Sequence, residues 1–385
     1  PRMTHAQRDL ILTPGQGLQV FQTDGQTGLY LFDGQQWVNS TAGVSANVSW
    51  GSGGNSASGS DFIGTTNDQS LKFKVNNVSS GSINRFGGAN TYLGYESGKI
   101  NTGQRNVGFG FGTLKTAANS TDNVAIGHSA LSTLNNGTNN VAVGSGALEK
   151  TTIGSTNVGL GYKSMNSNLG GSNNLAMGSL SMEKNVSGNA NIAVGNTSMQ
   201  YKVSGNNNVA IGAAALEGNI SGSGNLAIGY TAGRNETGSN KLYIANSSTT
   251  TPLIYGDFSA KFVSIGDVDV AKRSAAGTGG YNLLVKGGIL TEKVKVALAS
   301  SADWADYVFG DSYSLMPLNE VEEFTKTYKH LPNVPSAEEM VTNGLDVSQT
   351  SKLFMEKIEE LTLYMIEMNK EIKSLKLENE LLKNK

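Results

Sequence analysis

Residues that could support acid–base chemistry or bind a metal ion are few and scattered in this sequence. The three histidines, His5, His128 and His330, lie in different segments and share no ligand spacing, and the chain has no cysteine. Acidic residues cluster between Asp303 and Asp311, in an aromatic segment that places no base beside them. We therefore expect no catalytic residues, no metal ligands and no cofactor, and we expect His128 to be a surface residue.

The composition excludes several classes of partner. The 385 residues include 49 Gly and 6 Pro, only 16% are charged, and the net charge is −2. This balance favours a turn-rich β protein over a charged, disordered chain. Because there is no basic excess, nucleic acid is not an expected partner. No apolar run approaches the ~20 residues of a membrane-spanning helix, so no membrane span is expected either.

A short phrase that recurs with a 17-residue period organises the chain between Asn106 and Gly233. A fixed short period is the signature of stacked repeats. Each phrase starts with Asn, places a small residue between two apolar ones and ends with Gly, which is typical of a short strand followed by a turn. The eight phrases are NVGFG at 106, NVAIG at 123, NVAVG at 140, NVGLG at 157, NLAMG at 174, NIAVG at 191, NVAIG at 208 and NLAIG at 225.

A Leu or Met follows the Gly of most phrases by four residues and forms a second apolar column. One coil cannot bury its apolar face alone, but stacked coils turn each column into a continuous core. We therefore predict a mainly β chain built around a parallel β-roll, or β-solenoid, of 17-residue repeats. A disordered Gly/Asn/Ser linker fits the composition but not the Leu/Met register. The predicted core comprises Val124, Ile126, Leu131, Val141, Val143, Leu148, Val158, Leu160, Met165, Leu175, Met177, Met182, Ile192, Val194, Met199, Val209, Ile211 and Leu216.

The small residue in the middle of each phrase forms a column of its own. We expect this column to face a trimer axis or a close neighbour, while the Val and Ile side chains fill the core of their own chain. Its alanine members are Ala125, Ala142, Ala176, Ala193, Ala210 and Ala227.

The segments that flank the repeats differ in pattern. Asp-Gly turns between short apolar runs predict a small β-meander at the N-terminus. After the repeats, period-2 alternation gives way to helical spacing near residue 302. We divide the chain into a meander at 1–42, a Gly/Ser-rich β segment at 43–88, the β-roll at 89–240, a β neck at 241–300, a mixed segment at 301–350 and a coiled coil at 351–385.

The C-terminal stretch from Ser351 has the spacing of a coiled coil. Apolar residues alternate at steps of four and three, which predicts a helical seam that needs partner helices. Asn379 takes an a-type position, where a polar residue commonly sets register and oligomer state. The alternative is an amphipathic helix packed on its own chain. The seam comprises Phe354, Ile358, Leu361, Met365, Met368, Ile372, Leu375, Asn379 and Leu382.

The NVAIG phrases and the Ala-Leu pairs that follow them resemble the head repeats of YadA-like trimeric autotransporter adhesins. The resemblance covers most of the predicted β-roll. It implies a left-handed parallel β-roll in which three chains associate side by side, and hence a trimeric coiled coil at the C-terminus. The 17-residue period is longer than the repeat typical of that family, which implies longer loops.

The flanking segments resemble a second group, the tail-fibre-like exported surface proteins of Bacteroidota. The similar stretches are PRMTHAQRDLI, GLQVFQTDGQTGLYLFDGQQWV, DFIGTTNDQSLKFKVNN and NKLYIANSSTTTPLIYGDF. Residues 289–385 are similar to the intramolecular chaperone domain that such chains carry. The self-cleaving form of that domain shows a Ser-Asp-x-Arg-x-Lys core, whereas the sequence from Ser301 to Trp304 lacks the Arg and Lys. A trimerising clamp is therefore expected in place of self-cleavage.

Two functions would account for these sequence features. The first is an extracellular, cell-surface trimeric fibre of the adhesin type, whose stiff β-roll supports multivalent attachment to a glycan or a protein receptor. The second is a receptor-binding tail fibre of a phage or contractile injection system, with residues 1–42 as a docking segment. An enzymatic alternative, a self-processing chaperone or a glycan-cleaving fibre, lacks a supporting group of residues.

Overall fold

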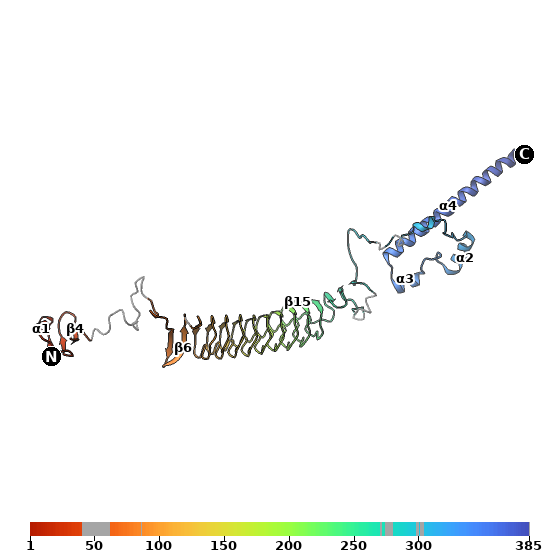
Figure 1. The fold of residues 1–385 in the computed structure, drawn as a ribbon. Helices are drawn as coiled ribbons and strands as arrows, with labels where there is room; N and C mark the ends of the chain where they lie inside the picture. Colours follow the sequence, from red (N-terminus) through yellow and green to blue (C-terminus); the bar gives the residue numbers. More distant parts are fainter. Residues whose placement is uncertain are drawn as a thin grey trace. The chain divides into compact units, whose positions relative to one another are not determined.

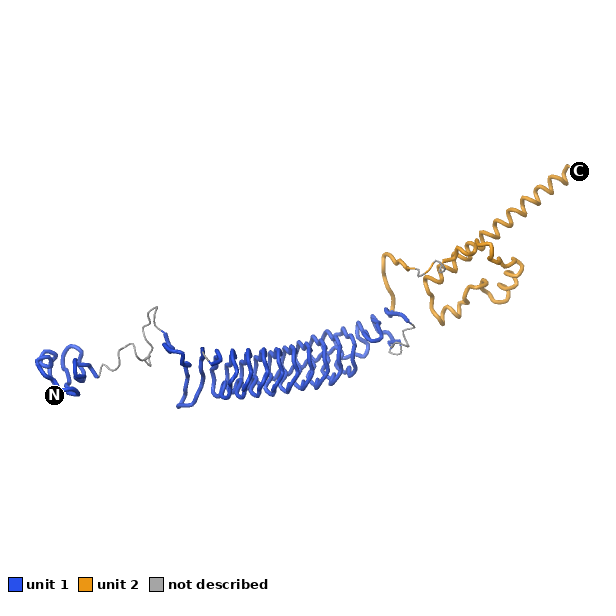
Figure 2. Tube along the Cα trace, in the orientation of Figure 1, with its two compact units in different colours: residues 1–286 blue, residues 287–385 orange. Residues whose placement is uncertain are grey.

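A computed structural model describes residues 1–40, 62–85, 87–269, 272–273, 280–297, 300 and 304–384 of the chain. The chain divides into two compact units, residues 1–286 and residues 287–385 (Figure 2). The first unit holds all the described sheet structure, and the second holds the long C-terminal helix.

The N-terminal segment forms a small four-stranded sheet, as predicted from its Asp-Gly turns. Its strands pair in the order β1-β2-β3-β4, with β1 parallel to β2 and the other pairs antiparallel. Asp33 fixes one turn by accepting the backbone N–H groups of Gln35 and Gln36 at 2.8 and 2.9 Å. The elements are β1 (Arg2–Met3), α1 (His5–Asp9), β2 (Gln19–Gln22), β3 (Gly28–Phe32) and β4 (Trp37–Asn39).

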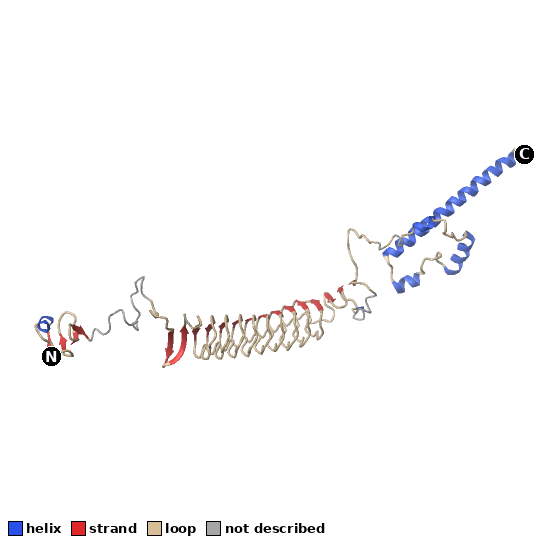
Figure 3. Ribbon diagram, viewed as in Figure 1, coloured by secondary structure: helices blue, strands red, loops and turns tan. Residues whose placement is uncertain are grey.

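The repeats form a β-solenoid, which confirms the predicted fold class. Its strands make one 15-stranded sheet in which every strand pairs with its neighbours in sequence (Figures 1 and 3). The ten strands from β7 to β16 are parallel, and equivalent residues of successive coils lie in register. These strands are β7 (Thr91–Leu93), β8 (Val107–Phe109), β9 (Val124–Ile126), β10 (Val141–Val143), β11 (Val158–Leu160), β12 (Leu175–Met177), β13 (Ile192–Val194), β14 (Val209–Ile211), β15 (Leu226–Ile228) and β16 (Lys241–Ile244).

In each three-residue strand the small middle residue points inward and its two apolar neighbours point outward. This is the reverse of the expected arrangement. The six Ala residues of the small column are fully buried in the core of their own chain. The interior beside each strand is narrow: a Cβ added at Gly108, one of two Gly in this column, would lie 2.8 Å from Ser97 Oγ. A larger side chain would not fit there, so strand alternation places its apolar neighbours outside.

Twelve of the eighteen predicted core residues therefore face outward from the single chain, and their assignment to its core was wrong. The other six, from the Leu/Met column, are fully buried and fill the space that the Ala column leaves. The buried residues are Leu131, Leu148, Met165, Met182, Met199 and Leu216. The outward residues are Val124, Ile126, Val141, Val143, Val158, Leu160, Leu175, Met177, Ile192, Val194, Val209 and Ile211.

Antiparallel strands and aromatic side chains close both ends of the solenoid. The β5–β6 hairpin (Leu71–Val75 and Val78–Ile83) pairs with β7. At the other end β17 (Ile254–Asp257) and β18 (Phe262–Ile265) continue the sheet antiparallel, and β19 (Leu283–Val285) completes it. Tyr92 and Tyr243 occupy the inward position of the two terminal parallel strands, so a ring covers each end of the small-residue column. Such caps protect a solenoid from end-to-end pairing.

The second unit is helical where it has regular structure. A 3₁₀ turn (Asp306–Phe309), α2 (Leu318–Tyr328) and α3 (Ala337–Asn343) precede the 37-residue helix α4 (Val347–Lys383). Asp346 begins α4 by accepting the Gln349 backbone N–H at 2.9 Å. The helix thus starts four residues before the predicted coiled coil.

Candidate oligomerisation surfaces

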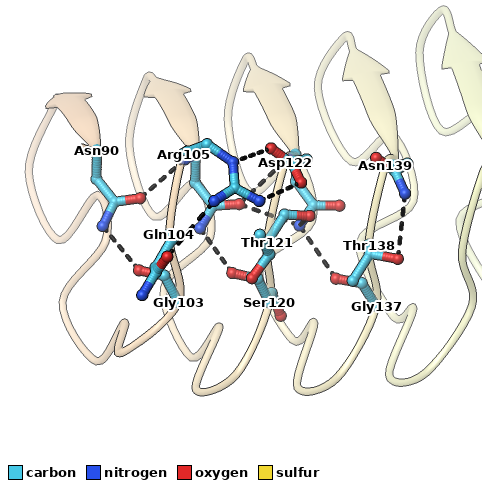
Figure 4. A network of polar contacts seen from close by, with 12 residues as sticks. Asn90, Gly103, Gln104, Arg105, Ser120, Thr121, Asp122, Gly137, Thr138 and Asn139 are labelled. Carbon is cyan, nitrogen blue, oxygen red and sulfur yellow. Dashed lines mark hydrogen bonds and ion pairs between the residues drawn. The ribbon is translucent and has the colours of Figure 1, made fainter. Parts of the chain in front are cut away.

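A ladder of buried asparagines holds the parallel strands in register. Each is the first residue of its coil's phrase (Figure 4). From Asn106 on, the side chains bond to one another from coil to coil, and Asn90 Oδ1 accepts the backbone N–H of Asn106 at 2.8 Å. Asn123 is typical: its Nδ2 donates to Asn106 Oδ1 and to Gly137 O at 3.0 and 3.1 Å. Its Oδ1 accepts the backbone N–H and the Nδ2 of Asn140 at 2.9 and 3.0 Å. The members are Asn90, Asn106, Asn123, Asn140, Asn157, Asn174, Asn191, Asn208 and Asn225.

The ladder was not predicted from the sequence, although the signal for it is present there. Asn and Gly are the only residues that never vary in the eight phrases. A polar residue that is required at every coil, and that lies beside a buried strand, has to satisfy hydrogen bonds inside the protein. The ladder satisfies these hydrogen bonds inside the protein, and the apolar residues occupy the outer face of each strand.

The outward residues of the parallel strands form a continuous apolar surface, which we name the strand stripe. It is two side chains wide and ten strands long, about 43 Å at ~4.8 Å per strand. Thr91 is its one polar member. Most of its side chains are partly or largely exposed in the single chain; Ile126 and Ile211 have relative exposures of 41% and 42%. One column is Thr91, Val107, Val124, Val141, Val158, Leu175, Ile192, Val209, Leu226 and Leu242, and the other is Leu93, Phe109, Ile126, Val143, Leu160, Met177, Val194, Ile211, Ile228 and Ile244.

A surface of this length is unlike the scattered apolar residues that water-exposed proteins tolerate. Contiguous apolar patches larger than a few hundred Å² mark interaction sites. The strand stripe is also regular and free of charge from β8 to β15, which suits packing against a similar surface.

Aromatic side chains follow the strand Gly in several coils and lie beside the strand stripe. Tyr95 and Phe111 stack at 5.6 Å between ring centroids, and Phe111 and His128 stack at 5.0 Å with nearly parallel rings. His128 is exposed, as expected. Tyr162 and Tyr230 hold the same position in later coils and are exposed.

The predicted seam of α4 is exposed along its whole length in the single chain. All nine seam residues, Asn379 included, are exposed, at about half or more for the apolar ones. Charged residues flank the seam in a pattern that suits parallel helices: Glu371 and Glu378 occupy g positions, and Lys376 and Lys383 occupy the e positions five residues later. In a parallel, in-register coiled coil such g and e residues of neighbouring helices pair.

A different face of α4 packs on its own chain. Tyr307 and Tyr313 donate their hydroxyl hydrogens to Glu356 and Glu360, and Tyr364 donates to Met316 O at 2.5 Å. The hydrogen bond to Glu356 raises the pKa of Tyr307 to about 12. These polar contacts fix the orientation of the helix and leave its apolar seam free for partner helices.

Glu359 lies on the same helix as Glu356 and Glu360 but takes part in none of these hydrogen bonds. It is 8% exposed, and its Oε2 has no hydrogen-bond partner among the described residues. Burial, followed by the carboxylate of Asp306, raises the pKa of Glu359. The folded unit therefore binds more protons than the unfolded chain just above the ordinary glutamate pKa, so the contribution of Glu359 to stability falls as pH rises through that window.

We expect Glu359→Gln to stabilise the helical unit at pH 7, because the substitution removes a carboxylate charge whose buried Oε2 has no hydrogen-bond partner among the described residues. The gain should vanish below pH 4, where Glu359 is already protonated. Thermal unfolding of the full chain at the two pH values measures both effects. Glu360→Gln is the matched control: it weakens the contacts of Glu360 with Tyr313 and with Lys357 Nζ (2.8 Å), so it should lower stability at pH 7. A Glu359→Gln variant less stable than wild type at pH 7 would contradict the account.

The described residues hold no group of three or more His, Cys, Asp or Glu side chains that could bind a metal ion. Of the acidic cluster, Asp303 lies outside the described residues, as do Ser301 and Ala302, while Asp306 begins the 3₁₀ turn. In the part of the chain that the structure describes, no helix is both long and apolar enough to cross a bilayer.

Comparison with known proteins bears on the N-terminal segment. A family model described as a phage tail-like trimerisation region matches residues 1–56. No curated protein and no solved structure matches the chain. The matched residues include the N-terminal sheet and lie apart in sequence from both the strand stripe and the seam of α4.

Together these findings define a class of protein. The β-solenoid and the trimerisation match support a fibre-like structural protein that assembles as a homotrimer. They also fit the tail-fibre-like part of the resemblance seen in the flanking segments.

Proposed function

We propose that this chain forms an extracellular homotrimeric fibre in which three solenoids pack side by side through their strand stripes. The observation that carries this proposal is the stripe itself, in which every outward strand position except Thr91 is apolar and lies on the surface of a single chain. Burying an exposed apolar surface releases ~25 cal/mol per Å², so a stripe of this size drives association strongly. Three copies related by a three-fold axis bury it without leaving an open surface.

The two ends of the chain support the same assembly. The trimerisation match covers the N-terminal residues, and the exposed seam of α4 requires partner helices at the C-terminus. The g and e charges favour helices that run parallel and in register. Three parallel chains would then be joined at the first residues, along the solenoid and at the last residues.

The fibre would serve attachment to a surface, with three copies of each exposed patch acting together. Aromatic residues outside the stripe, such as Tyr162, Tyr201 and Tyr230, would contact a glycan or a protein receptor. The adhesin and tail-fibre settings both use this architecture. The match over residues 1–56 favours the tail-fibre setting, in which the N-terminal segment docks the fibre to its particle.

The absence of cysteine allows a direct test of the packing. Ile211→Cys places a single thiol on the strand stripe, and Ser187→Cys places one on an exposed turn of the solenoid. In a three-fold assembly the three thiols of Ile211→Cys would face one another across the axis. A short bismaleimide added to dilute protein should yield covalent dimers from this variant, with the third chain left single.

The Ser187→Cys variant should remain single-chain under the same conditions. Both thiols should react fully with a monofunctional maleimide once the protein is unfolded. The proposed packing would be wrong if Ile211→Cys gave no more dimer than Ser187→Cys.

A further inference from the structure

A second internal ladder runs through the later coils, and a lysine interrupts it. Asn168, Asn185, Lys202 and Asn219 occupy equivalent positions of successive coils, and all four are fully buried. The first two make the expected contacts: Asn185 Nδ2 donates to Asn168 Oδ1 at 2.8 Å, and each amide also donates to a glycine carbonyl three residues later. Lysine in the third position places an amine in a space that otherwise holds amides.

The amine of Lys202 lies against the side chain of Asn219. Its Nζ is 3.2 Å from Asn219 Oδ1 and 2.7 Å from Gly222 O, and it makes no ion pair with any described residue. Burial lowers the pKa of Lys202 to about 8. A substantial fraction of the amine is therefore neutral near physiological pH, and a neutral amine is nucleophilic.

Asn219 is held so that its amide nitrogen points away from the lysine. Nδ2 donates to the carbonyl oxygens of Glu236 and Gly238 at 2.9 and 3.1 Å. Glu236 is the next residue of the same column, one coil further on. Its carboxylate accepts the Gly238 backbone N–H and the Tyr243 hydroxyl, both at 2.6 Å. A lysine, an asparagine and a glutamate thus occupy successive coils of one column.

We propose that Lys202 and Asn219 become joined by an isopeptide bond after folding. Nζ attacks Cγ of Asn219, the Nζ–Cγ bond forms, the Cγ–Nδ2 bond breaks, and the leaving nitrogen departs as ammonia. One proton of the amine goes to the leaving nitrogen. We assign the relay of this proton to Glu236, whose backbone carbonyl accepts from that nitrogen at 2.9 Å. The reaction uses no oxidant, metal or other reactant, because an amine and a primary amide become a secondary amide and ammonia.

The bond would have a clear structural role. It would join adjacent coils covalently near the C-terminal end of the solenoid, in a chain that has no cysteine for disulfides. It would also convert a buried amine into a neutral amide like those of the neighbouring rungs. The proposal does not depend on the trimer, since both residues lie inside one chain.

Mass spectrometry of the full chain tests the proposal. The linked protein is expected to be lighter than its sequence mass by one ammonia. Trypsin does not cleave after an acylated lysine, so the linked chain should give one peptide spanning residues 185–234 with an internal ring. An unlinked chain would give two peptides, 185–202 and 203–234.

Three variants make the outcome specific. Asn219→Ala removes the acceptor and keeps the cleavage site, so it should give the full sequence mass and the two peptides. Lys202→Asn restores the uninterrupted ladder, so it should fold and show no loss of ammonia. Glu236→Gln should lower the linked fraction, and full linkage in that variant would remove Glu236 from the proposed reaction.

Lys150→Gln, which replaces an exposed lysine of an earlier coil, is the control that should stay linked. A folded wild-type chain with its full sequence mass, cleaved by trypsin after Lys202, would overturn the proposal. Circular dichroism on each sample establishes that the protein is folded when its mass is measured.

Discussion

Replacement of Asn157 by alanine is expected to destabilise the solenoid by about 3–5 kcal/mol, a large part of the stability of an ordinary domain. Asn157 lies in the middle of the asparagine ladder, and its side chain makes four hydrogen bonds inside the protein. Nδ2 donates to Asn140 Oδ1 and Gly171 O at 3.1 and 2.8 Å. Oδ1 accepts the backbone N–H and the Nδ2 of Asn174, both at 3.1 Å. Alanine removes all four and leaves the buried N–H of Asn174 without a partner.

The matched control for this prediction is Asn136→Ala. Asn136 is exposed, and among the described residues its side chain accepts only from the Nδ2 of Asn119, at 3.3 Å. Its loss should change stability by less than about 0.5 kcal/mol. Chemical unfolding followed by circular dichroism measures both variants. Equal effects of the two substitutions would show that the ladder does not contribute more than surface asparagines do.

A charge in the middle of the seam of α4 is expected to dissociate the helices of the assembly. Ile372 is about half exposed in the single chain and takes an a position, so a coiled coil would bury it. Ile372→Asp would place three carboxylates side by side in that core, at a cost of several kcal/mol for each buried unpaired charge. We therefore expect the dissociation constant of the assembly to rise by at least ~100-fold, about 2.7 kcal/mol.

Sedimentation of the full chain over a range of concentrations measures this change. Lys370→Asp is the control, because it introduces the same carboxylate two residues away at an exposed f position. That control should sediment as wild type does. If Ile372→Asp and Lys370→Asp sedimented alike, the seam would not be an interface.

The sequence predicted the solenoid well because its period is a property of the backbone stack. Each coil contributes one strand to the sheet, so the spacing between phrases in the sequence becomes the spacing between paired positions, as between Val124 and Val141. The heptad spacing of α4 could likewise be recognised in the sequence. The small N-terminal sheet was also predicted, since Asp-Gly turns leave few alternatives.

The direction in which the strands face could not be read from hydrophobicity alone. An apolar–small–apolar strand has apolar side chains on both faces, so it has no polar side to mark the outside. Side-chain volume, in contrast, indicates which strand residues face inward. The middle residue is always Ala or Gly, whereas its neighbours range from Val to Phe, as at Phe109. A tightly packed interior restricts size in this way, and an outer surface does not.

The contacts of the helical unit had no sequence signal. Tyr307 and Tyr313 meet Glu356 and Glu360, which lie 49 and 47 positions further along the chain. Neither pair follows a periodic pattern, and polar pairs of this kind are set by the packing of the whole unit. The sequence showed that α4 has an apolar seam, but only the structure shows that a polar face contacts its own chain.

The central claim is that the strand stripe and the seam of α4 are covered by copies of the same chain. Light scattering of the intact protein tests it most directly, because it measures mass without assuming shape. A trimer is expected to have three times the 40.3 kDa of one chain and to keep this mass on dilution to low micromolar concentration. A stable species of 40.3 kDa, with both apolar surfaces exposed to water, would contradict it.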